Sequence, residues 1–181
     1  MVTILVRSGD LGASEIDSSA DELADGQALR LLTSGLVVEG PLAAWQIGFG
    51  ALAAAVVIRR EGAAVWWSAV LAGHVGSALI AYAIIGFGSA VGSASAEDAA
   101  NDPDYGISAV LGATLGALLA SGLRRGDQVI GALGIVAFFG LLPFSIGWVD
   151  IEHLLAFGLG AGVVLWLGSR STDARSLRGQ R

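Results

Sequence analysis

The chain has 181 residues, of which 54% are hydrophobic and 14% charged, and its mean hydropathy is +0.70. Soluble domains carry about a quarter charged residues, so this composition argues against an ordinary soluble domain and predicts a lipid bilayer as the surroundings. The chain has no Cys, two His and a net charge of −6, which excludes disulfides and disfavours common zinc sites and nucleic acid as a partner.

The N-terminal part of the chain differs in composition from the rest. Residues 1–28 are acidic and rich in Ser and Ala, without the charged-then-apolar layout of a signal peptide, and we expect them to form a disordered tail. The mildly apolar residues 29–40 read as an interfacial segment that leads into the membrane.

Five apolar blocks follow, each near the roughly 20 residues that cross a hydrocarbon core. They predict an all-α, polytopic transmembrane helix bundle with about five spans, contained in a membrane domain of residues 29–168. The blocks are rich in Gly and Ala at four-residue spacing, which permits close approach of helices in lipid, although such a composition also produces this spacing by chance. The expected spans are residues 42–58, 64–87, 105–123, 128–149 and 151–168.

The basic residues, all of them Arg, predict the orientation of the bundle. Pairs of Arg follow the first and third blocks, and residues 169–181 form an Arg-rich tail after the fifth block. Acidic residues occupy the connections on the other side, and the positive-inside rule makes the Arg side cytoplasmic. We therefore expect an integral membrane protein whose C-terminus lies in the cytoplasm.

Two side chains with potential chemistry start spans that enter from the same outer side. Ser108 follows the start of the third expected span by about three residues, and His153 holds a similar shallow place in the fifth. An imidazole within hydrogen-bond reach of a hydroxyl can serve as general base for a nucleophilic serine. The pattern predicts a Ser108–His153 pair, although a Ser in a membrane helix more often bonds its own preceding turn.

Neighbouring residues fit supporting roles around this pair. The helix start at Ser108 would present backbone N–H groups to an oxyanion, Gly106 would admit a substrate backbone, and Asp104 is the expected helix cap. Asp150 lies one turn before His153 and would orient it, or else Asp150 and Glu152 are solvated loop acids.

The pattern resembles the rhomboid family of intramembrane serine proteases. Gly106-Ile107-Ser108 is similar to the Gly-x-Ser motif of that family. In the family the catalytic His is followed at offsets of three and seven by small residues that allow close helix packing, and Ala156 and Gly160 stand at those offsets from His153. Arg30 and Thr33 resemble the Arg-x-x-Thr entry to the second core helix, and the Asp-x-Gly-x-Ser form looks like divergent bacterial rhomboid-like proteins.

The resemblance implies a Ser–His dyad that cleaves transmembrane substrates near the outer leaflet of a bacterial plasma membrane, without cofactor or metal. It matches the five blocks with the second to sixth helices of a six-helix core, leaving the first core helix without a counterpart. The family's oxyanion-stabilising His-x-x-x-Asn is also missing, and Gln46 is the candidate donor in that stretch.

Two other functions stay open at this point. One is an inactive rhomboid-like protein that binds transmembrane helices, and the other is a small membrane transporter subunit. His74 is the ionisable residue deep inside a block, where such groups are costly. The mapping places His74 away from the level of the dyad, so a structural hydrogen bond to a neighbouring helix is its expected role.

Overall fold

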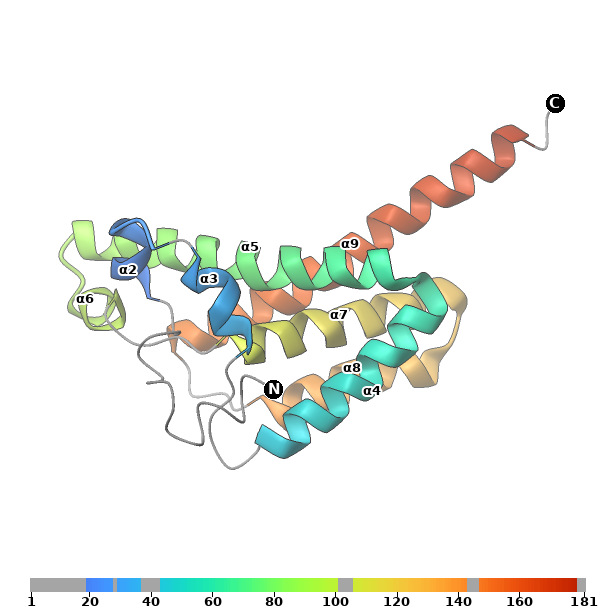
Figure 1. Cartoon of the computed structure of the whole chain (residues 1–181), viewed down its shortest axis with the longest axis horizontal. Coiled ribbons are helices and arrows are strands. Elements are labelled where there is room, and N and C mark those ends of the chain that lie inside the picture. The colour runs from blue at the N-terminus through green and yellow to red at the C-terminus, as the bar shows by residue number, and fades with distance from the viewer. Residues whose placement is uncertain (1–18, 28, 37–42, 101–105, 143–146, 179–181) are drawn as a thin grey trace.

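The computed structural model describes residues 19–27, 29–36, 43–100, 106–142 and 147–178, and the secondary structure within these ranges is helical (Figure 1). The all-α prediction is confirmed for this part of the chain. In chain order the elements are α2 (Ala20–Ala24), α3 (Arg30–Thr33), the 3-10 helix η2 (Ser34–Leu36), α4 (Ala43–Glu61), α5 (Ala63–Ala90), α6 (Ala94–Ala100), α7 (Ile107–Arg125), α8 (Gln128–Leu141) and α9 (Trp148–Arg178).

Three helices are long and apolar enough to cross a membrane: α5, α7 and the part of α9 from Trp148 to Ser169. They coincide with three of the five expected spans. α8 is a shorter apolar helix of 14 residues, about 21 Å at 1.5 Å per residue. α4 has 19 residues, but it ends in Arg59, Arg60 and Glu61, which shortens its apolar stretch.

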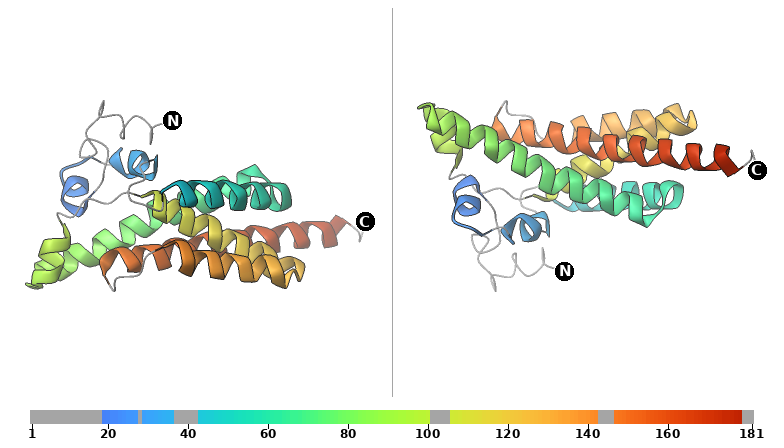
Figure 2. Two further views of the ribbon diagram at one scale, coloured as in Figure 1. Left: turned by 90° about the horizontal axis from the view of Figure 1, so that it is seen from below. Right: turned by 90° about the horizontal axis from the view of Figure 1, so that it is seen from above.

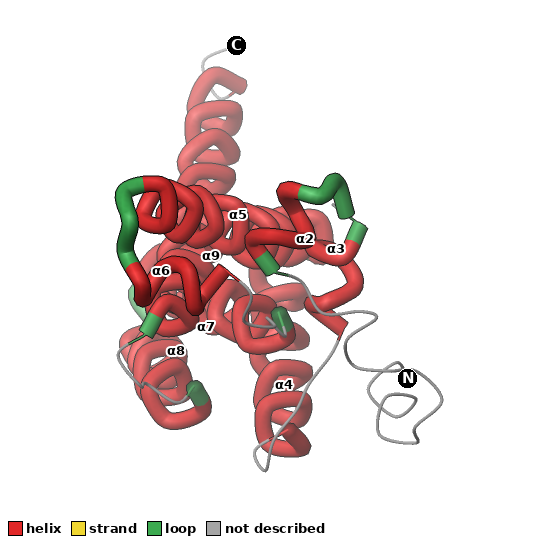
Figure 3. The backbone as a smooth tube through the Cα atoms, turned by 90° about the vertical axis from the view of Figure 1, so that its left-hand side faces the viewer, coloured by secondary structure: helices red, strands yellow, loops and turns green. Residues whose placement is uncertain are grey.

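Helix α7 lies at the centre of the bundle, as the end-on view shows (Figure 3). Every residue from Leu111 to Leu118 is buried, and the main apolar cluster joins α7 to the helices around it. A side-chain bond adds to this packing, since Trp66 Nε1 of α5 donates to Thr114 Oγ1 of α7 at 3.3 Å. The small residues of α7 let its neighbours approach closely, which is the packing expected of helices in lipid.

The α4–α5 and α7–α8 connections meet at one end of the bundle. Glu61 accepts hydrogen bonds from Arg124 and Arg125 at 2.7 and 3.0 Å, and Arg60 pairs with Asp127 at 2.8 Å. The prediction that these two Arg-bearing connections share one side is therefore confirmed. The C-terminal end of α9 lies toward the same end in both long views (Figure 2).

The ion pairs lower the pKa values of the carboxyl groups at this end. Partial burial raises the pKa of Glu61, but bonds from Arg125 and Ser121 and the charge of Arg124 outweigh that effect and leave its pKa lowered. The Arg60 hydrogen bond lowers the pKa of Asp127. Both acids are held in the charged form by their basic neighbours.

A tight turn between α7 and α8 brings these groups together. Gly126 has φ +68°, a left-handed conformation that glycine adopts without steric cost. Asp127 then caps α8 by accepting a hydrogen bond from the Ile130 N–H at 3.2 Å.

The stretch expected to be a disordered tail contains a short helix in its described part. α2 turns Ala20 and Leu23 toward an apolar cluster that includes Leu31 and Tyr82. These two residues are three apart and share one helical face, which gives the segment apolar area to bury despite its acidic composition. Residues 1–18 lie outside the described residues.

Helix α9 is longer at both ends than the expected span. It begins at Trp148, three residues before the expected start, and continues past residue 168 to Arg178, through most of the expected tail. At its start, Trp148 Nε1 donates to the backbone oxygen of Ser95 at 3.2 Å and ties α9 to α6.

Candidate active site

The structure brings Ser108 and His153 together. Ser108 is the second residue of α7 and His153 lies in the second turn of α9, and both helices start at the same end of the bundle (Figure 1). The Ser108 Oγ and His153 Nε2 atoms lie 2.7 Å apart. His153 is 3% exposed, whereas Ser108 is half-buried. The expected pair is thus formed with hydrogen-bond geometry between residues 45 positions apart.

Small residues make this distance possible by letting α7 and α9 pack backbone to backbone. A Cβ on Gly112 would lie 3.3 Å from the His153 carbonyl oxygen, and a Cβ on Gly160 would lie 2.8 Å from the Ala113 Cα. Ala156 is fully buried. The prediction of close packing at Ala156 and Gly160 is confirmed, whereas Gly158 and Gly162 face open space and do not take part.

The start of α7 sets the position of Ser108. Gly106 occupies the N-cap position with φ −65° and ψ 0°, and its carbonyl accepts the Val110 N–H at 3.0 Å. Ser108 therefore lies in the first turn, at the end of the helix that carries a partial positive charge. Asp104, the expected cap, lies outside the described residues.

The acids at the start of α9 are buried, which corrects the alternative of solvated loop acids. Asp150 is 7% exposed and Glu152 is 3% exposed. α9 starts at Trp148, earlier than expected, so both residues belong to this helix and not to a loop. Asp150 Oδ2 accepts the Gly147 N–H at 2.9 Å, as an acid three residues after the N-cap does in a capping box.

Glu152 joins α9 to α5 through a contact that the sequence reasoning missed. Ser77 Oγ donates to Glu152 Oε1 at 3.3 Å, and Ser77 is fully buried. Successive helical residues point about 100° apart, so Glu152 faces α5 while His153 faces α7. In the sequence, the polar residues His74 and Ser77, one turn apart in an apolar helix, indicate a polar contact between α5 and a neighbouring helix.

His74 lies closer to the dyad than the mapping implies, which corrects that expectation. Its ring is 5% exposed and packs against Gly106, two residues before Ser108. α5 is 28 residues long and extends beyond the start of α7, so its middle rather than its end is level with that start (Figure 1). Gly106 was expected to admit a substrate backbone. In the structure it is buried, and the His74 ring occupies the space beside it.

The side-chain amide of Gln46, the candidate oxyanion donor, binds a backbone carbonyl of α8. Its Nε2 donates to the Leu141 carbonyl oxygen at 3.2 Å and thereby links the start of α4 to the last turn of α8. The bond satisfies a carbonyl that the helix end leaves without an intrahelical donor.

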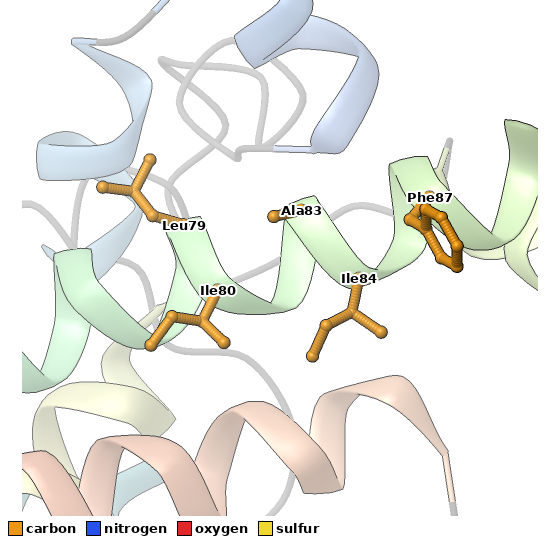
Figure 4. Close-up of a pocket in the computed structure, with 5 residues that line it drawn as sticks. All are labelled: Leu79, Ile80, Ala83, Ile84 and Phe87. Carbon is orange, nitrogen blue, oxygen red and sulfur yellow. The ribbon is translucent and has the colours of Figure 1, made fainter.

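A groove of about 430 Å³ lies on the half of α5 that leads to α6 (Figure 4). It is lined by the apolar side chains of Leu79, Ile80, Ala83, Ile84 and Phe87. Among the residues that the structure describes, no group of three acidic or His side chains is placed to hold a metal ion.

Comparisons with known proteins give no relative to set beside this geometry. No protein-family model matches the chain, and no curated protein or solved structure matches it significantly.

Proposed function

We propose that this chain is an intramembrane serine endopeptidase of the rhomboid type, with Ser108 as nucleophile and His153 as general base. The 2.7 Å distance between Ser108 Oγ and His153 Nε2 carries the proposal. A buried imidazole from one membrane helix, paired with a serine in the first turn of another, is the arrangement that activates a hydroxyl.

The chemistry follows from the two atoms. Ser108 Oγ attacks the scissile carbonyl while His153 Nε2 takes its proton, which requires the tautomer with hydrogen on Nδ1. The first-turn N–H groups of α7 stabilise the oxyanion. His153 then protonates the leaving amine, and water hydrolyses the acyl-enzyme with the same residue as base.

The substrate class follows from the position of the dyad. Ser108 lies in the first turn of a membrane helix, so the cleaved bond belongs to a transmembrane protein near the surface of the bilayer. In this proposal α4 and α8 also cross or enter the membrane, giving five spans, and the Arg60/Glu61/Arg124/Arg125 end faces the cytoplasm of a bacterial cell.

A second candidate is a rhomboid-like protein that binds transmembrane helices without cutting them. The observation in its favour is the bond between Gln46 and Leu141, because it engages the one amide expected to replace the missing oxyanion donors. Loss of one such donor costs roughly 10²–10³ in rate.

Labelling by a fluorescent fluorophosphonate decides between the two. The purified protein, in detergent and in native membranes, is compared with Ser108→Ala and with Ser68→Ala, an exposed serine of α5 that bonds its own preceding turn. We expect the wild type and Ser68→Ala to label equally and Ser108→Ala not to label. Equal labelling of wild type and Ser108→Ala would overturn the protease and leave the helix-binding function.

The absence of Cys allows a clean test of the orientation. Glu97→Cys and Arg59→Cys place single thiols at exposed positions on opposite ends of the bundle. A membrane-impermeant maleimide added to intact spheroplasts should modify the first and spare the second. The reverse pattern would contradict the proposed orientation.

A further inference from the structure

The His74 ring fills the space of two missing side chains. A Cβ on Gly35 would lie 2.7 Å from His74 Nε2 and 2.9 Å from Cδ2. A Cβ on Gly106 would overlap Cε1 and lie 2.8 Å from Nδ1. Gly106 has an ordinary φ of −65°, so the glycine is required there for space and not for its conformational freedom.

Gly106 transmits this contact to the nucleophile. It is the N-cap residue of α7, and its carbonyl accepts the first hydrogen bond of the helix from Val110. Ser108 lies between these two residues. The ring of His74 therefore bears on the residue from which the first turn of α7 starts, and a shift of Gly106 would move Ser108 Oγ relative to His153.

The same face of α5 also reaches the base. Ser77, one turn after His74, donates to Glu152, the residue before His153. His74 and Ser77 thus support both halves of the dyad from one rigid helix.

We propose that His74 is a positioning residue for Ser108: its ring, wedged between Gly35 of η2 and Gly106, fixes the first turn of α7 at the distance at which His153 can take the Ser108 proton. This inference rests on the proposed function. It also couples the segment Ser34–Leu36 to the nucleophile, because the two glycines contact the same ring.

A compensating pair of substitutions tests the wedge. Gly106→Ala adds a methyl group that overlaps the ring, and His74→Ala removes the ring. We compare the two single variants, the double variant and Gly158→Ala, a helical glycine whose Cβ meets open space. For each, fluorophosphonate labelling of Ser108 gives the limiting rate constant and the half-saturating probe concentration, and thermal unfolding gives Tm.

We expect each single variant to lower the limiting rate constant at least tenfold with little change in half-saturation, at a temperature where every variant is folded. The double variant should label at least threefold faster than Gly106→Ala, because the added methyl group then occupies the space of the ring. Gly158→Ala should label as wild type does.

Wild-type labelling in Gly106→Ala would overturn the inference, and so would a double variant that labels no faster than Gly106→Ala. A loss confined to Tm would make His74 a packing residue without a positioning role. Absence of Ser108 labelling in the wild type would instead refute the proposed function, and the positioning role with it. The steric coupling of His74 and Gly106 would still be measured by the Tm values of the wild type, the variants His74→Ala and Gly106→Ala, and the double variant.

Discussion

The substitution Gly160→Ala tests the packing that brings the dyad together. A Cβ at Gly160 would overlap the carbonyl oxygen of Ala113 and lie 2.8 Å from both its carbonyl carbon and its Cα. Carbon atoms pack at about 3.5 Å or more, so the two carbon contacts alone require α9 to retreat from α7 by roughly 0.7 Å, and the overlap with the carbonyl oxygen requires more. Such a shift, carried along α9, would lengthen the 2.7 Å Ser108–His153 contact beyond the roughly 3.2 Å limit of a hydrogen bond.

The matched control is Gly158→Ala on the same helix, where the added methyl group meets open space. Ala is favoured over Gly in a helix by up to about 1 kcal/mol, so this variant should gain stability. Gly160→Ala should instead lose about 1–3 kcal/mol, the usual cost of overpacking. The two changes are chemically identical, and the structure predicts opposite signs.

The assay is unfolding by SDS titration, followed by the fluorescence of the five Trp residues, together with the rate of fluorophosphonate labelling. We expect Gly160→Ala to label at least tenfold more slowly than Gly158→Ala. Equal stability and equal labelling of the two variants would refute the argument that the α7–α9 contact sets the dyad distance.

Two further predictions concern the polar contacts between helices. Because the pKa of Glu61 is lowered in the folded protein, its contribution to stability is present above its ordinary pKa of about 4.5 and is lost as the pH falls through the lowered value. Glu61→Gln should therefore reduce the fall in Tm at acid pH. An unchanged fall in Tm would contradict this prediction. Ser77→Ala removes the donor to Glu152 and should lower stability by about 1 kcal/mol in the SDS titration, whereas Ser68→Ala, which loses a bond to its own preceding turn, should change stability little.

The three long helices could be predicted from length and apolar composition, because a bilayer imposes both. The approach of Ser108 and His153 could be predicted because two helices that enter from the same side place residues of similar depth at one level. Neither inference needs knowledge of side-chain packing.

The remaining features depend on the boundaries and tilts of helices, which a sequence does not specify. Asp150 and Glu152 are buried residues of α9 because the helix begins at Trp148, before both of them, and α8 ends at Leu141 with 14 residues, short of the expected end of the fourth span at residue 149. The resemblance implies a place for His74 away from the level of the dyad, and the structure contradicts this. The length of α5 beyond the start of α7 sets its true level.

The proposed function depends most directly on whether His153 activates Ser108. The measurement is the second-order rate constant for fluorophosphonate modification of Ser108, located by peptide mass spectrometry, in wild type and His153→Ala. General-base assistance is worth about 10²–10⁴, so we expect the variant to react at least a hundredfold more slowly. An adduct on another residue, or equal rate constants in the two proteins, would contradict the assignment of Ser108 and His153 as a catalytic dyad.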